Sequence, residues 1–314
     1  MFSKLFQYGN FSCIMTEARA TRLPLKRVNS QEYKQVKYIS HGSYGNVYLC
    51  QKEGTNEFVA VKQISFTKSE SKNVAREIVI MSKIQAPTII QFAGFDREKD
   101  GAGILIFMDY KEKGALTKHI LKKNTLSSTD KQIILAGIAH GMMKLHKHDI
   151  FHRDLKPDNV LLDNNNRPFI TDFGLARHLQ DSLDLTRGCG TPLYLAPEAD
   201  ESPTIKCDVY SFGILAYHVI TGKKPYGNVN PNGFYTRVKK GLRPTFDDQI
   251  NINIKQLLEK CWSQDPNDRP TFREIYYKLS LFQSSRCKRN PEDQRHLDYF
   301  IDDSVDIEQV RAYI

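Results

Sequence analysis

The chain has 314 residues, of which 40% are hydrophobic and 11% aromatic, which suits two lobes with a sizeable core better than one small domain. The net charge of +9 could indicate nucleic-acid binding, but the basic residues are scattered through amphipathic segments, so we expect no direct contact with nucleic acid. The six cysteines stand singly, without the Cys-x-x-Cys pairs of zinc or redox sites, and the longest apolar-leaning run, 209–220, is too short for a membrane span. A cytoplasmic location is expected, with the nucleus as an alternative.

Residues 1–30 are basic and poor in acids, with Glu17 as the single carboxylate. Mitochondrial presequences share this composition, and Met15 could equally be the true start. We expect instead a flexible or lobe-packing extension over residues 1–32.

From Tyr33 the sequence becomes β-prone, and two strands flank a glycine turn that runs from Ser40 to Val47. A glycine hairpin lets backbone N–H groups lie over phosphates, although a glycine pair alone more often marks an ordinary hairpin. The next strand, 59–62, ends in Lys62, and a helix follows over 75–84. An isolated Lys or Glu there would be a solvated charge contributing well under about 1 kcal/mol.

A buried strand over 104–107 leads into residues 108–111, which are predicted to connect the lobes. Beyond Gly114 the pattern is helical, and the segment 129–146 has apolar residues close to the 3.6-residue period of a buried amphipathic helix. Three histidines fall in or near it. A metal site is conceivable, but no acid or cysteine completes it, so solvated or capping histidines are predicted at His140, His146 and His148.

The central stretch of the chain is 150–174. Residues 152–159 read His-Arg-Asp-Leu-Lys-Pro-Asp-Asn, and residues 172–174 read Asp-Phe-Gly. Between them, three asparagines separate two β-prone runs, which predicts a hairpin over 160–171. This hairpin would bring Asp154, Asn159 and Asp172 to one small region. Any single one of them could merely cap a turn, but two carboxylates, an amide and a lysine together suit phosphoryl transfer around Mg²⁺.

In this combination the sequence, over about Tyr33 to Leu281, resembles the eukaryotic-type protein kinases. The fold implied is α+β and bilobal, with a small antiparallel-β N-lobe that carries one regulatory helix and a larger, mainly α-helical C-lobe. The resemblance places the N-lobe at about 33–108, the hinge at 109–112, the C-lobe at 113–282 and a charged tail at 283–314.

The resemblance also implies cofactors and roles. ATP and Mg²⁺ would be the cofactors, with Asp154 as the catalytic base and Lys156 neutralising the transferred group. Ser40 stands where the family has its first loop glycine, which should stiffen the loop or weaken ATP binding. The metal ligands would be Asn159 and Asp172. The residues implied to contact or position the nucleotide are Ile39, Ser40, Gly42, Gly45, Val47, Ala60, Lys62, Glu77, Met108, Asp109, Lys111, Leu161 and Asp172.

Two features resemble serine/threonine kinases: Lys156, and the Gly-Thr-Pro-x-Tyr motif at 190–194 before Ala-Pro-Glu at 196–198. The segment 261–272, with its Cys-Trp and Arg-Pro-Thr-Phe, resembles tyrosine kinases and the tyrosine-kinase-like group. Together they favour a serine/threonine kinase of the tyrosine-kinase-like group acting on protein substrates. A pseudokinase scaffold and a small-molecule kinase are the alternatives. The resemblance implies four contacts: an ion pair of Lys62 with Glu77, and contacts of Thr191 with Asp154 or Lys156, of Arg269 with Glu198, and of Asp208 with the 152–153 backbone.

Regulation and substrate choice follow from a few positions. Arg153 and Arg177 suggest control by an upstream kinase acting on Thr186 or, less favourably, Ser182. Kinases that select arginine upstream of the target carry an acid where this chain has Ala115, so no strong selection is expected. The acidic tail contains a Tyr-Phe-Ile run at 299–301 that could form a docking element.

Overall fold

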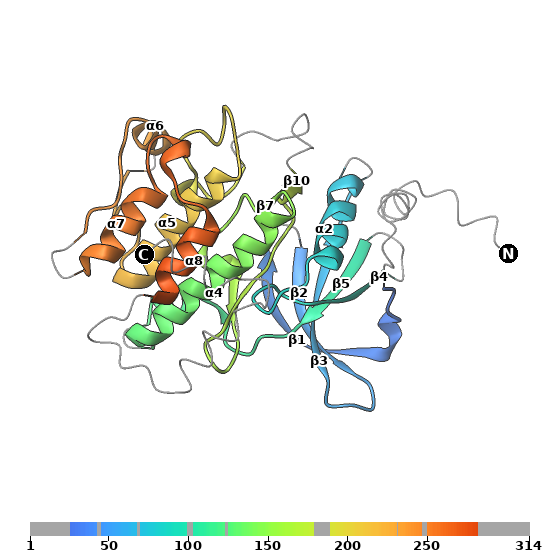
Figure 1. Cartoon of the computed structure of the whole chain (residues 1–314). Coiled ribbons are helices and arrows are strands. Elements are labelled where there is room, and N and C mark those ends of the chain that lie inside the picture. The colour runs from blue at the N-terminus through green and yellow to red at the C-terminus, as the bar shows by residue number, and fades with distance from the viewer. Residues whose placement is uncertain are drawn as a thin grey trace. The chain divides into compact units, whose positions relative to one another are not determined.

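The computed structural model describes residues 26–42, 45–67, 70–98, 103–122, 125–178, 189–230, 232–246 and 250–281. Internal contacts divide the chain into two compact units. The first extends to Lys111 and also contains Asp172–Ala176, and the second contains 112–171 and everything from Arg177 onward. Figure 1 labels their helices and strands.

The first unit is built on a five-stranded antiparallel sheet in the order β1-β2-β3-β5-β4. Since side chains alternate between the faces of a strand, each face has its own residues. Cys50, Val59, Val61 and Phe107 share one face and form a buried apolar cluster. The strands are β1 (Tyr33–Gly42), β2 (Gly45–Lys52), β3 (Phe58–Ser65), β4 (Phe92–Arg97) and β5 (Gly103–Asp109).

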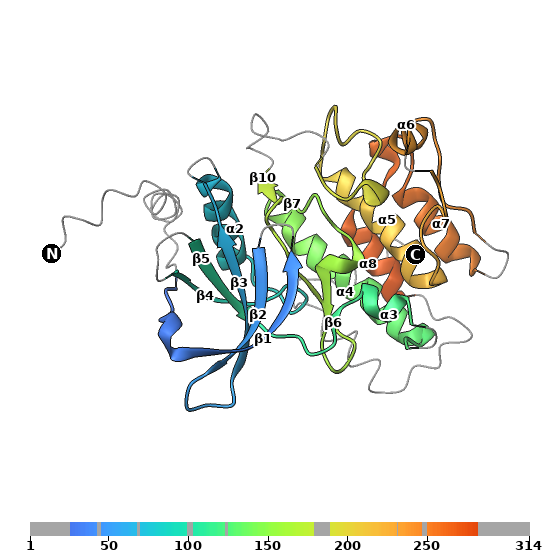
Figure 2. The ribbon, with the colours of Figure 1, turned by 180° about the vertical axis from the view of Figure 1, so that it is seen from behind.

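Helix α2 (Ser71–Lys83) is the helix beside this sheet in Figures 1 and 2. It buries Val74, Ile78 and Met81, which recur at helical spacing on one side. The helix begins at Ser71 rather than at Ala75, because its first turn is polar and gives no apolar period in the sequence.

Helices dominate the second unit. The predicted helix over 129–146 is α4, which begins directly after its N-cap Ser127 with a capping box in which Ser127 and Asp130 bond reciprocally. The most buried helix is α5, which ends at Gly222 in the left-handed conformation, as predicted. The helices are α3 (Thr117–Ile120), α4 (Ser128–Lys147), α5 (Lys206–Thr221), α6 (Phe234–Lys239), α7 (Ile252–Cys261) and α8 (Phe272–Leu281).

Short strands in the second unit frame the central stretch. The predicted hairpin is present as β8 (Val160–Leu162) and β9 (Pro168–Ile170), with β6 (Gly114–Ala115) paired to β8. A separate pair joins β7 (Ile150–Phe151) to β10 (Arg177–His178). The predicted α+β class, with an antiparallel sheet and a mainly helical larger part, is confirmed. Within the described ranges, no helix is long and apolar enough to cross a bilayer.

Candidate active site

In the first unit, the structure brings together Lys62 of β3, Glu77 of α2 and Asp172. Lys62 Nζ lies 2.7 Å from Glu77 Oε1 and 3.0 Å from Asp172 Oδ1. The predicted ion pair is therefore present. Lys62 and Glu77 are both buried, at 5% and 3% exposure, so the pair is shielded from solvent and is not a surface charge contact.

Burial and charge act on this pair in opposite directions. Burial lowers the pKa of Lys62, but the carboxylates of Glu77 and Asp172 outweigh it and raise the lysine pKa above its ordinary 10.5. Burial raises the pKa of Glu77, and the charge of Lys62 opposes that rise. Lys62 is thus a fixed cation with two carboxylates around it.

The predicted nucleotide-binding side chains of the sheet share one face. Val47 pairs with Lys62, and Ala60 pairs with Met108, so these four point to the same side. Ser40 lies opposite Val47 across β1 and β2. This is the face opposite the buried apolar cluster of Cys50, Val59, Val61 and Phe107.

The glycine hairpin joins β1 to β2, with Gly42 opposite Gly45. Ile39 lies in β1 beside an irregularity in the register between Tyr38 and Ser40. Gly45 has φ +148°, and a Cβ there would lie 1.9 Å from the carbonyl oxygen of Gln63. Glycine is therefore required at this position. The tip of the hairpin, 43–44, lies outside the described residues.

At the end of β5, the backbone N–H of Asp109 donates to the Gln91 carbonyl at 3.1 Å. Lys111 Nζ lies 3.1 Å from Asp109 Oδ2, and Met108 is buried. Leu161 of β8 belongs to the second unit, where it pairs with Phe169 and with Ala115.

In the second unit, Asp154 is the centre of a network of hydrogen bonds. Lys156 Nζ lies 2.7 Å from Asp154 Oδ2, and Asn159 Nδ2 donates to the same oxygen at 3.0 Å. The backbone N–H and the hydroxyl of Thr191 both donate to Asp154 Oδ1 at 2.9 Å. Lys156 also lies 2.7 Å from Thr191 Oγ1. Thr191 was predicted to contact Asp154 or Lys156, and it contacts both.

Thr191 can approach Asp154 because the preceding residue is a glycine. Gly190 has φ +119°, and a Cβ on it would lie 2.7 Å from the carbonyl oxygen of Arg153. Any larger residue would push the 190–194 segment away from the 152–159 loop.

Asp208 of α5 holds the turn before Asp154, as predicted. It is fully buried, and its carboxylate accepts from the N–H of His152 at 2.8 Å and of Arg153 at 2.9 Å. His146 Nε2 lies 2.9 Å from the same carboxylate. Burial alone would raise the pKa of Asp208, but these hydrogen bonds and the nearby histidines lower it below its ordinary 3.8.

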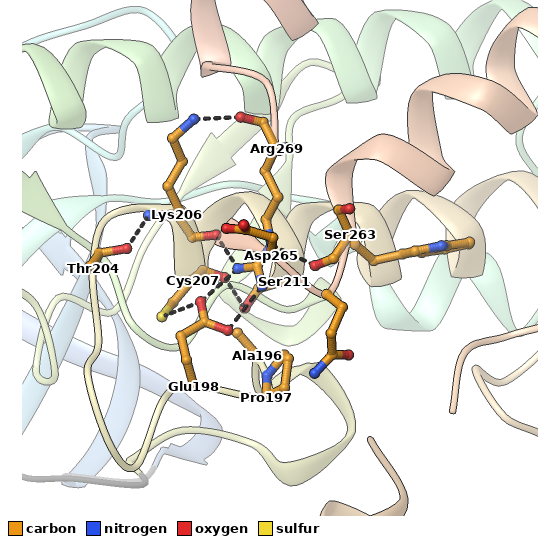
Figure 3. A network of polar contacts seen from close by, with 12 residues as sticks. Ala196, Pro197, Glu198, Thr204, Lys206, Cys207, Ser211, Ser263, Asp265 and Arg269 are labelled. Carbon is orange, nitrogen blue, oxygen red and sulfur yellow. Dashed lines mark hydrogen bonds and ion pairs between the residues drawn. The ribbon is translucent and has the colours of Figure 1, made fainter. Parts of the chain in front are cut away.

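The end of the 190–198 segment is clamped by Arg269, as Figure 3 shows. Arg269 donates to Glu198 through Nη1 at 2.6 Å and Nη2 at 2.9 Å, which is the predicted bidentate pair. Three further partners in this network left no signal in the sequence. Cys207 Sγ donates to Glu198, and Arg269 also donates to the carbonyls of Ser263 and Lys206.

The histidine prediction was wrong in two places. His140 is buried at 1% exposure and packs against the ring of Tyr276, so it is neither solvated nor a cap. The side chain of His146 bonds to Asp208, an acid that lies far from it in the sequence. Only His148, exposed at the end of α4, fits the prediction. A partner 62 residues away leaves no local signal in the sequence.

The protein kinase domain family matches residues 33–279. The chain belongs to this family. Among curated relatives, the kinase is 32% identical over 281 residues to "Probable serine/threonine-protein kinase gdt4" of Dictyostelium discoideum, covering 85% of this chain and 17% of that protein. It is 32% identical over 262 residues to "Serine/threonine-protein kinase STY46" of Arabidopsis thaliana, covering 80% of this chain and 44% of that protein. The kinase therefore spans less than half the length of these relatives.

Proposed function

We propose that this kinase transfers the γ-phosphate of Mg-ATP to serine and threonine hydroxyls of protein substrates. The observation that carries the proposal is the network around Asp154, in which one carboxylate is fixed by Lys156, Asn159 and Thr191. A carboxylate fixed in this way can accept the proton of an attacking hydroxyl, because it is already oriented before substrate binds. The names of the relatives, all serine/threonine kinases, agree with the predicted acceptor.

The residues present suit magnesium, with Asp172 of the first unit expected to ligate one ion and Asn159 of the second unit another. Because Asn159 Nδ2 donates to the backbone oxygen and the carboxylate of Asp154, its amide oxygen is the group left to serve as a ligand. Asp172 supplies a carboxylate, and oxygen ligands are those that Mg²⁺ prefers. When bound, these ions would neutralise charge on the ATP phosphates. Lys62, fixed by Glu77, would position the α and β phosphates.

The choice of serine and threonine rests on Thr191 and Lys156, which lie against the two sides of Asp154. Their contacts hold the 190–194 segment close to the base and support a shallow slot suited to a short hydroxyl side chain. All of the expected catalytic groups are present, from Lys62 to Asp172, which argues against a pseudokinase scaffold. We assign the kinase to the tyrosine-kinase-like group and expect it to act in the cytoplasm.

Phosphoamino-acid analysis tests this acceptor choice. Purified kinase would be given labelled Mg-ATP and a peptide library with equal numbers of serine, threonine and tyrosine acceptors. We expect label on phosphoserine and phosphothreonine. Label on phosphotyrosine alone would overturn the assignment.

We also propose activation by an upstream kinase at Thr186, or less favourably at Ser182, both of which lie outside the described residues. Arg153 and Arg177 are buried, and β10 places Arg177 opposite Phe151, two residues before Arg153. Two guanidinium groups in one neighbourhood repel each other until an anion joins them. Unchanged activity in a Ser182→Ala, Thr186→Ala double variant would contradict this proposal.

A further inference from the structure

A cavity of about 430 Å³ in the second unit is not lined by any residue assigned above to ATP, magnesium or phosphoryl transfer. It is bordered by the last turns of α4, the first turns of α5 and the first residues of α8, which come together from distant parts of the chain. We refer to it as the basic pocket. Its lining residues are Met143, Lys144, His146, Lys147, Ile205, Lys206, Val209, Thr271, Phe272 and Arg273.

The lining combines positive charge with an apolar surface. It includes four lysines or arginines and no aspartate or glutamate. Two neighbouring acids are already engaged. Asp208 is fully buried against His146, and Glu274 accepts hydrogen bonds from the backbone N–H and hydroxyl of Thr271. The accessible apolar part is provided by Met143 and Ile205, whereas Val209 and Phe272 are buried. Such a pocket suits a ligand that carries both carboxylates and large apolar side chains.

The chain itself contains a segment of this chemistry. Residues 297–303 read Leu-Asp-Tyr-Phe-Ile-Asp-Asp, and further acids flank them from Glu292 to Glu308. This segment lies outside the described residues. We propose that the basic pocket binds segment 297–303 of the same chain, with its carboxylates on Lys144, Lys147 and Arg273 and its apolar side chains over Met143 and Ile205.

The chain length permits this contact. Helix α8 begins at the pocket with Phe272 and runs ten residues to Leu281, about 15 Å at the helical rise. Residues 282–297 then separate Leu281 from Asp298, and they can span up to about 55 Å when extended. A tethered segment also binds at a high effective concentration, so weak contacts suffice.

Zero-length cross-linking of the full-length kinase tests the proposal. A carbodiimide joins a lysine amine to a carboxylate with loss of water, and mass spectrometry then locates the linked peptides. We expect links from Lys144 or Lys147 to the carboxylates of 298–303. An equal mixture of ¹⁵N-labelled and unlabelled kinase distinguishes contacts within one chain from contacts between chains, since only the latter give links of mixed isotope content.

Two matched double variants distinguish the effect of charge in the basic pocket from the effect of the overall charge of the protein. A Lys147→Glu, Arg273→Glu double variant should reduce these links by at least about tenfold, because two attractions become repulsions. A Lys118→Glu, Lys260→Glu variant, altered at two exposed lysines outside the pocket, should retain them. Circular dichroism would establish that both variants fold. Links spread evenly over surface lysines, links unaffected by the pocket variant, links of mixed isotope content, or no links at all would each overturn the proposal.

Discussion

The guanidinium of Arg269 forms two hydrogen bonds, at 2.6 and 2.9 Å, with the carboxylate of Glu198, which lies 71 residues earlier in the chain (Figure 3). The Arg269 side chain is fully buried, whereas that of Glu198 is 15% exposed. This pair joins the end of the 190–198 segment to the turn before α8. It fixes the segment whose other end, at Thr191, bonds to the carboxylate of Asp154, the predicted catalytic base.

Removing Glu198 should therefore destabilise the kinase. In Glu198→Ala, the buried guanidinium of Arg269 loses its counter-charge, and we expect a loss of roughly 3–5 kcal/mol in the free energy of unfolding. Urea unfolding of the purified variant measures it. The control is Glu201→Ala, which removes an exposed carboxylate that pairs with Lys239 and should leave the unfolding midpoint unchanged. Equal losses of unfolding free energy in the two variants would show that the Glu198–Arg269 pair contributes no more to stability than an exposed ion pair.

The charge of Asp208 should give stability a defined dependence on pH. Its folded pKa lies below the ordinary 3.8, so its contribution is fully present above that value and is lost as the pH falls through the folded pKa. Asp208→Asn should cost about 1–3 kcal/mol near neutral pH, because a hydrogen-bond acceptor is lost beneath His152 and Arg153. The difference in unfolding free energy between wild type and variant should narrow below about pH 4. A difference that stayed constant down to pH 2.5 would contradict this assignment.

Glu77→Gln should lower kcat while leaving the fold intact. The substitution keeps the volume of the side chain but removes the charge that fixes Lys62, and a misplaced positioning group costs about a hundredfold in rate. Steady-state kinetics with a peptide substrate would measure the loss. Glu53→Gln, an exposed carboxylate of the same unit, is the matched control and should behave as wild type. If the two variants were equally active, the ion pair would have no role in turnover.

The preference for or against arginine upstream of the phosphorylated residue should depend on the residue at position 115, which is Ala115. Ala115 is the second residue of β6 and offers no carboxylate, which leaves exposed Asp158 as the nearest acid predicted to face the peptide. A peptide array of the wild type should show no dominant arginine upstream of the phosphorylated residue. Ala115→Glu should introduce that preference, because an arginine would gain a bidentate partner. A wild-type array dominated by upstream arginine would show the inference wrong.

Local patterns in the sequence predicted much of the fold and of the candidate site. The hairpin over 160–170, the strand that ends in Lys62 and the stop at Gly222 each depend on residues close together in the chain. The long-range pairs, such as Lys62 with Glu77 and Glu198 with Arg269, required the resemblance to the kinase family. Nothing local would have joined them.

Contacts that are not part of a recognisable sequence motif could not be predicted. His146 of α4 reaches Asp208 of α5 because these two helices pack together in the second unit. Cys207 reaches Glu198, nine residues earlier, through a loop that no motif marks. His140 was predicted to be a solvated or capping histidine, since no acid or cysteine nearby in the sequence completed a metal site. It lies instead against Tyr276 of α8, a neighbour fixed by tertiary packing.

The most direct test of the central claim is phosphate transfer from radiolabelled Mg-ATP to a mixed-peptide library by purified wild type and by Asp172→Ala. The variant removes a predicted metal ligand and one of the two carboxylates beside Lys62. We predict transfer by the wild type to serine and threonine, and its loss in Asp172→Ala. If neither protein transferred phosphate, even after an activating kinase had phosphorylated Thr186, or if the variant were as active as the wild type, the proposed mechanism would be wrong.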